Sequence, residues 1–164
     1  MVFHIWSDSF KDGDLMPQAQ VYNGMGQKGQ NLSPSLRWSG APKGTKSFVI
    51  TIFDPDAPTG SGWWHWVVVN IPPDVDFIPE GSSSKNELPK GAIQVKNDFG
   101  QYNYGGATPP PGLNHHYVIT IHALDVSKLD VNKDNSPASI GFNVHHHSLG
   151  SAKITCIYGN KTNP

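Results

Sequence analysis

Two segments of the chain place histidine and aspartate beside turn-forming residues and apolar strands. The first is DPDAPTGSGWWHWVVVNIP, from Asp54 to Pro72, and the second is GGATPPPGLNHHYVITIHALD, from Gly105 to Asp125. Each begins as a loop rich in glycine and proline and delivers a histidine to the start of a strand. Polar and aromatic loops held by rigid strands are typical of binding pockets. We therefore expect the two segments to build one site between them.

Alternation along the first of these strands divides its side chains between two faces. His65 falls on one face with Val67 and Val69, and Trp64 falls on the other. Trp63 and Trp64 could line an apolar wall of the pocket or fill the core. Aromatic residues in β proteins more often fill the core.

The second strand carries His115 and Tyr117 on one face and His116 on the other. If this strand, the His65 strand and the strand before Asp54 meet at one end, four side chains converge: Asp54, His65, His115 and Tyr117. Each residue alone has a structural alternative, because aspartate shapes Asx turns and histidine can pack in a core. The four together favour a site.

The chemistry of this set suits an anion. Histidine and tyrosine side chains donate hydrogen bonds to phosphate or carboxylate groups, and the Gly105-Gly106 pair can add backbone N–H groups. An aspartate beside histidine fixes the tautomer and favours the protonated ring, which then donates to the anion. Asp56, two residues after Asp54, could instead face the cationic part of a zwitterion such as ethanolamine.

Other motifs carry less chemistry. Asp98-Phe99-Gly100 spells the metal triplet of kinases, but the remaining kinase motifs are absent and we treat it as chance. His145 to His147 lie in or at the end of a predicted helix, where adjacent side chains diverge and cannot all bind one ion. Cys156 is alone, so it offers neither a disulfide nor a cysteine metal site. We expect no metal, no cofactor and no catalytic residue, since GxSxG and HExxH are also absent.

The elements that position these groups are predicted to be strands. Runs of β-branched and aromatic residues bounded by turn residues span 47–53, 65–71, 117–124 and 152–158, with weaker candidates at 2–6, 19–22 and 92–96. Seven short strands indicate an antiparallel sandwich or barrel. A helix is predicted with Ser136 as its N-cap and Pro137 as its first residue. We also expect a short helix or turn at 126–129 and a mobile polar loop at 81–87.

Composition limits the broader possibilities. A chain of 164 residues fits a single domain, 1–164, with one core. The net charge of −1 and the lack of basic runs argue against nucleic-acid binding, and no apolar run is long enough to span a membrane. The first residues, MVFHIWSDSF, do not form a signal peptide, so we expect a cytoplasmic protein. Several Trp and Tyr residues with few charges would allow a homodimer.

Together these residues resemble the phosphatidylethanolamine-binding protein (PEBP) family, also called Raf kinase inhibitor-like proteins. The two loops match its DPDAP…WHW-VVNIP and GGA-PP-G--H-Y motifs, and NGMG…GQNLSPSL-W and GFNVHHHSL are similar to its bacterial and archaeal branch. The resemblance implies a mainly β, Greek-key antiparallel β-sandwich with one or two short helices and a small anion pocket. Carried over residue by residue, this pocket comprises Asp54, Asp56, His65, Gly106, Pro109, His115 and Tyr117.

Some positions depart from the animal members of that family. The Thr59–Gly62 loop is shorter and uncharged, His116 replaces an arginine, and Thr108 replaces a common glycine. The sequence also ends soon after Tyr158, without the helix that borders the animal pocket, so we expect a more open site. The leading interpretation is a non-catalytic module that binds a phosphate-type or carboxylate group on a small molecule or lipid headgroup. The alternatives are a regulator of a kinase or protease acting through the pocket rim, and a hydrolase using His65 with an aspartate.

Overall fold

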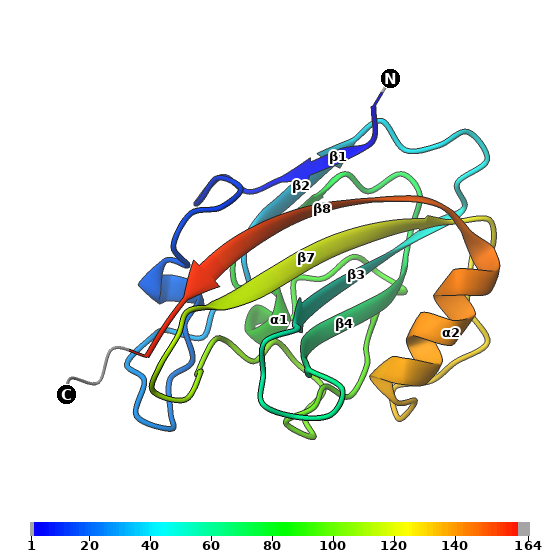
Figure 1. Cartoon of the computed structure of the whole chain (residues 1–164). Coiled ribbons are helices and arrows are strands. Elements are labelled where there is room, and N and C mark those ends of the chain that lie inside the picture. The colour runs from blue at the N-terminus through cyan, green and yellow to red at the C-terminus, as the bar shows by residue number, and fades with distance from the viewer. Residues whose placement is uncertain (1, 161–164) are drawn as a thin grey trace.

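The computed structural model describes residues 2–160, which form two antiparallel sheets, two α-helices and a short 3-10 helix at Gln18–Gln20 (Figure 1). The helices are α1 (Ser82–Lys85) and α2 (Pro137–His147). The strands are β1 (His4–Trp6), β2 (Leu36–Ser39), β3 (Ser47–Asp54), β4 (Trp63–Ile71), β5 (Phe77–Ile78), β6 (Ile93–Gln94), β7 (His115–Leu124) and β8 (Ser148–Tyr158). No helix among residues 2–160 is both long and apolar enough to cross a bilayer.

The larger sheet has the order β6-β4-β3-β7-β8, and the smaller sheet has the order β1-β2-β5. Within the larger sheet, β3, β4 and β6 follow one another, and β7 then returns to pair with the other side of β3. This return is the connection that defines a Greek key. The predicted fold class, a mainly β Greek-key sandwich with short helices, is confirmed.

Alternate residues of the larger sheet build the core on its two faces. On the inner face, Ile50, Ile52 and Ile119 pack in one cluster with residues of the smaller sheet such as Trp38. On the outer face, a second cluster of valines, leucines and isoleucine includes Ile140 of α2. Figure 1 shows α2 lying beside one end of the larger sheet. Ser136 caps this helix by accepting a hydrogen bond from the Ser139 N–H, 3.1 Å away, as the sequence predicted.

A β-bulge interrupts alternation in β4 at the point where the site begins. Ile52 pairs with Trp66, but the next residue, Phe53, pairs with Trp64, so His65 is an extra residue opposite β3. A bulge of this kind reverses the faces of the residues beyond it. Trp66 consequently joins the inner cluster, while Trp64 packs against the outer one.

The prediction that His65 shares a face with Val67 and Val69 is therefore wrong. Both valines belong to the outer cluster. The His65 ring instead lies 5.2 Å, between centroids, from that of Tyr117, a residue of the inner cluster. The bulge directs His65 to the inner side, where the sequence-based site required it.

Several other elements differ from their predictions. Residues 19–22 are not a strand: they overlap the 3-10 helix, and only Val21 makes an isolated bridge, to Ala107. Residues 81–87 contain α1 rather than only a loop, and its Ser82 is fully buried. Of the two alternatives for residues 126–129, the helix is absent, and the chain bends at residues 126–128. The short strands β2 and β5 were not predicted.

Candidate functional site

The pair Asp54 and His115 forms the polar centre of the site. Asp54 ends β3, His115 begins β7, and the two strands run in register from Ser47 opposite Leu124 to Phe53 opposite Val118. The His115 Nδ1–H donates to Asp54 Oδ2 over 2.7 Å, and both side chains are almost completely buried. This bond fixes the tautomer of His115 and leaves Nε2 as its ligand-facing nitrogen.

Asp54 has a second structural role. Its Oδ1 accepts a hydrogen bond from the Asp56 N–H over 2.8 Å, which closes an Asx turn across Pro55. Asp54 therefore has both of the roles considered from the sequence: it forms the turn and it pairs with the histidine. One carboxylate holds both the loop and the imidazole in place.

His65 approaches the same space from β4 with its orientation set by the backbone. Its Nδ1 donates to the Gly105 carbonyl over 2.8 Å, because a carbonyl oxygen can only accept. Burial lowers the pKa of His65, so the ring is neutral near pH 7. In that state its Nε2 accepts hydrogen bonds rather than donating them.

Tyr117 adds an unpaired hydroxyl. It lies two residues after His115 on the same face of β7 and is 1% exposed. Its oxygen is buried and has no hydrogen-bond partner among the described residues. Burial raises the pKa of the phenol well above its usual range, so the hydroxyl keeps its proton as a donor. A buried donor without a partner costs about 1–3 kcal/mol, which a bound acceptor would recover.

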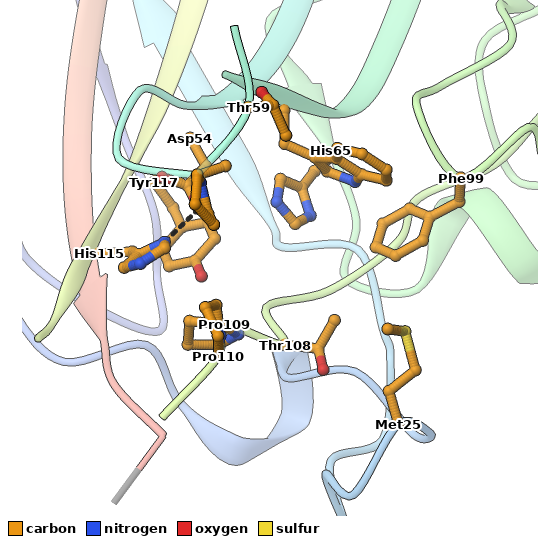
Figure 2. A pocket seen from close by; sticks show the side chains of 13 residues that line it. Met25, Asp54, Thr59, His65, Phe99, Thr108, Pro109, Pro110, His115 and Tyr117 are labelled. Carbon is orange, nitrogen blue, oxygen red and sulfur yellow. Dashed lines mark hydrogen bonds and ion pairs between the residues drawn. The ribbon is translucent and has the colours of Figure 1, made fainter. Parts of the chain in front are cut away.

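These four side chains line a cavity of about 190 Å³. Figure 2 shows His115, Tyr117 and Asp54 on one side of it and His65 and Phe99 on the other. Most of the wall is apolar, and none of the described lysine or arginine side chains lines it. The complete lining is Met25, Asp54, Ala57, Pro58, Thr59, Trp63, His65, Phe99, Thr108, Pro109, Pro110, His115 and Tyr117.

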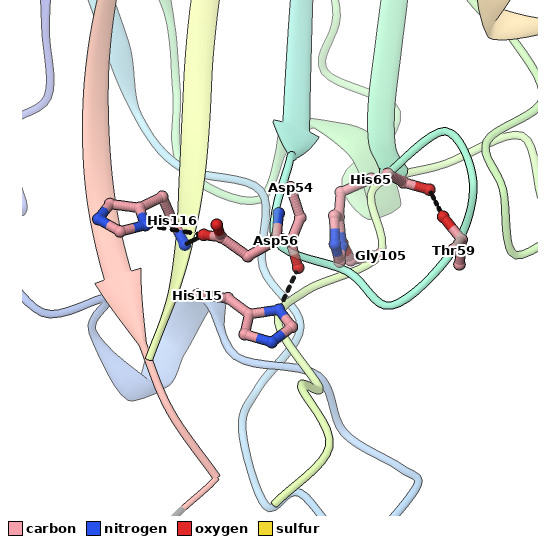
Figure 3. A network of polar contacts seen from close by, with 8 residues as sticks. Asp54, Asp56, Thr59, His65, Gly105, His115 and His116 are labelled. Atoms are coloured by element: carbon pink, nitrogen blue, oxygen red, sulfur yellow. Dashed lines mark hydrogen bonds and ion pairs between the residues drawn. The ribbon is translucent and has the colours of Figure 1, made fainter. Parts of the chain in front are cut away.

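Asp56 does not line this cavity. It turns to the opposite side of β7, where its Oδ2 accepts from both the backbone N–H and the ring Nδ1–H of His116, each over 2.7 Å (Figure 3). The hydrogen bond from the His116 ring lowers the pKa of the Asp56 carboxyl. This exposed pair ties the loop after β3 to the start of β7. His116 thus has a partner outside the cavity.

Gly106 supports the cavity without lining it. A Cβ atom here would lie 2.2 Å from the Gln20 carbonyl oxygen, so only glycine fits. Its N–H donates to Asn31 Oδ1 over 2.7 Å, and the Gly105 N–H donates to the His65 carbonyl over 3.0 Å. The expectation that these two N–H groups are available to an anion is wrong, since both are used within the fold. Pro109, in contrast, lines the cavity as predicted.

Sequence reasoning missed one large part of the wall. Phe99 lines the cavity and stacks on Tyr22 with ring centroids 5.1 Å apart. Its neighbour Asp98 accepts a hydrogen bond from the Trp64 N–H over 2.7 Å, which fixes this turn against β4. The Asp-Phe-Gly triplet was the only signal, and its meaning here is structural. Met25, from the NGMG segment, had no signal beyond its glycine-rich surroundings.

The histidines at the end of α2 make separate contacts. His146 donates to the Phe142 carbonyl over 2.9 Å, and His147 pairs with Asp125 over 2.9 Å. Within residues 2–160, no three histidine, cysteine, aspartate or glutamate side chains are arranged to hold a metal ion.

Comparison with known proteins gives consistent matches along the chain. A family model described as phosphatidylethanolamine-binding protein matches residues 6–159. The UPF0098 protein YbhB of Escherichia coli is 53% identical over 153 residues, covering 93% of this chain and 97% of that protein. The crystal structure of E. coli YbcL, described as a new member of the mammalian PEBP family, matches with a TM-score of 0.94 and 45% identity, covering 97% of this chain and 99% of that one. A putative PEBP homolog from Chlamydia trachomatis matches with a TM-score of 0.82 and 26% identity over 97% of this chain and 98% of that one.

Proposed function

The chain belongs to the phosphatidylethanolamine-binding protein family, and on this basis we propose that its cavity binds the phosphate-type group of a small organic molecule or lipid headgroup without transforming it. The observation that carries this proposal is the buried Tyr117 hydroxyl, a donor without a partner within residues 2–160, beside the His115–Asp54 pair. A bound oxyanion would accept from both groups. Asp54 Oδ2 already accepts a hydrogen bond from the His115 ring and Oδ1 accepts one from the Asp56 N–H, so the anion does not meet a bare carboxylate.

The neutral His65 ring distinguishes between a phosphate-type group and a carboxylate as the bound anion. Its Nε2 needs a donor from the ligand, because Nδ1–H is already bonded to Gly105. A phosphate monoester with one proton offers both an acceptor oxygen and a hydroxyl, whereas an ionised carboxylate offers acceptors alone. We therefore favour a phosphate-type group over a carboxylate. The apolar wall formed by Trp63, Phe99 and the prolines would contact the organic part of the ligand.

The proposal that no reaction follows binding rests on the cavity lining. The lining contains no serine or cysteine. Of its threonines, Thr59 donates its hydroxyl to the Gly62 carbonyl, and the Thr108 hydroxyl has no hydrogen bond to an activating histidine or aspartate among the described residues. The competing hydrolase interpretation would use His65 with an aspartate. Incubation with 4-nitrophenyl phosphate separates the two: turnover that disappears in His65→Ala would establish the hydrolase.

A titration with phosphoethanolamine, followed by amide chemical shifts between about pH 5.5 and 8, tests binding. A hydrogen bond to a charged group is worth about 1.5–3 kcal/mol, so His115→Gln should weaken binding of the anion about tenfold or more. Asp54→Asn should also weaken it, since the His115 ring loses the carboxylate that orients it. His116→Gln is the matched control, because its ring lies on the other side of β7 and should leave affinity unchanged.

Two results would overturn this assignment. Tighter binding by Asp54→Asn would show that the carboxylate only repels the anion. Shifts that map away from β3 and β7, or equal affinity in all three variants, would place the ligand elsewhere.

A second candidate function, a regulator of a kinase or protease, has one supporting observation. Leu113 is 87% exposed, in the loop between the cavity residues Pro110 and His115, and Met25 on the cavity wall is 72% exposed. Apolar side chains at a rim are common in protein contacts. Recovery of a kinase or protease by the wild-type protein, but not by Leu113→Asp, would favour this role.

A further inference from the structure

A second cavity lies on the opposite face of the larger sheet, under α2. Its volume is about 330 Å³, at the lower end of the range for small-molecule sites. Strands β3, β4, β7 and β8 form the floor, and α2 forms one wall. The lining is Thr51, Trp64, His122, Pro137, Ile140, Gly141, Val144, His145, Ser148 and Ser151.

The floor of this cavity is polar and has unused hydrogen-bonding capacity. His122 lies opposite Val49 of β3 and Ser151 of β8 on the same row of the sheet. Among residues 2–160, no side-chain hydrogen bond involves the His122 ring or the Thr51 hydroxyl, although Thr51 is only 8% exposed. Burial lowers the pKa of His122 to about 4, so the ring is neutral near pH 7. It then offers one donor and one acceptor nitrogen.

The walls are mainly apolar, with His145 and Ser148 as polar exceptions. Trp64 is held against Phe53, with ring centroids 4.2 Å apart, and presents its indole from the floor. Ile140 and Val144 of α2 face the sheet from above. Within residues 2–160, no aspartate, glutamate, lysine or arginine side chain lines the cavity. An ionic ligand would thus lose hydration without gaining a carboxylate, ammonium or guanidinium partner.

Gly141 provides a separate indication that this space serves a ligand. It lies inside α2, where glycine costs about 0.5–1 kcal/mol relative to alanine. Packing does not require this glycine, because an added Cβ atom would meet no atom within 4 Å. Its missing side chain instead leaves the helix wall of the cavity open.

We propose that this second cavity is a binding site for a small, uncharged organic molecule with a flat apolar body and a hydroxyl or amide group. The body lies between Trp64 and the α2 side chains, and the polar group exchanges hydrogen bonds with His122 and Thr51. This site is independent of the anion cavity, because the two open on opposite faces of the sheet.

Phenol is a suitable probe, and benzoate is its charged counterpart of similar size. Phenol should cause saturable amide shifts in β3, β7 and α2 at about 1–10 mM, the affinity expected for so small a molecule, whereas benzoate should not. His122→Leu removes the hydrogen bonds at similar volume and should weaken phenol binding about fivefold or more. Gly141→Leu should block the site, and Gly141→Ala, the matched control, should keep most of its affinity.

Two readouts keep the outcome interpretable. Each variant should retain the amide spectrum of a folded domain and an unchanged phosphoethanolamine titration at the first cavity. The proposal fails if phenol gives no saturable shifts, if the shifts map outside these elements, if benzoate binds equally well, or if His122→Leu and Gly141→Leu both bind phenol like the wild type.

Discussion

Acid should destabilise this fold through His122, and His122→Gln should remove that contribution. Burial lowers the pKa of the folded-state ring from 6.5 to about 4. The unfolded chain therefore binds a proton before the folded chain does, and the stability present above pH 6.5 is lost as pH falls toward about 4. A tenfold difference in proton affinity is worth about 1.4 kcal/mol, so the full loss is about 3 kcal/mol.

Denaturant unfolding followed by tryptophan fluorescence at about pH 7.5 and about pH 4 measures this effect. Because other groups also titrate in this range, the informative quantity is the difference between wild type and variant. The wild type should lose about 2–3 kcal/mol more than His122→Gln. His145→Gln, an exposed histidine of α2, is the control and should behave like the wild type. Equal losses in the wild type and His122→Gln would refute the inference that the His122 ring is held neutral by burial.

Three further outcomes follow from single side chains. Tyr117→Phe should weaken phosphoethanolamine binding about two- to tenfold in an NMR titration. The melting temperature should not fall, because the Tyr117 hydroxyl has no hydrogen-bond partner among the described residues. Unchanged affinity would show that the Tyr117 hydroxyl does not contact the ligand. Gly106→Ala should cost about 1–3 kcal/mol in thermal unfolding, since the added methyl group would overlap the Gln20 carbonyl; a melting temperature like that of the wild type would contradict this. Cys156 is buried, and burial raises the pKa of its thiol to about 12. A thiol reagent should therefore label Cys156 only when the domain unfolds, and rapid labelling under native conditions would contradict its burial.

Strand alternation predicted much of the site because β3 and β7 pair without a break there. Asp54, His115 and Tyr117 converge as the sequence indicated. His65 also reaches the cavity, but through a bulge that reverses the face assigned to it. A bulge depends on how two strands pair over their length, and the local pattern WWHWVVV carries no sign of it.

The missed elements depend on contacts distant in sequence. Strands β2 and β5 are short, and they pair with each other rather than forming around a strong apolar run. In the serine-rich α1, the Ser83 hydroxyl bonds to Gln94 over 2.6 Å and accepts from the Tyr104 N–H over 2.9 Å. Polar composition predicted a loop there, but these tertiary hydrogen bonds order the segment. The direction of Asp56, toward His116 and away from the cavity, likewise depends on the Asx turn.

Because of the bulge at His65, an insertion or deletion in this part of β4 would change which side chains face the site. The amino-acid composition of the strand gives no sign of this sensitivity. Trp63, Trp64 and His65 are consecutive, yet Trp64 lines one cavity while its two neighbours line the other. Removing one residue at this point would leave β4 just as apolar and still able to pair with β3, but it would change which side chains face each cavity. A histidine motif transplanted from this protein to another antiparallel sheet would need the extra residue as well as the histidine.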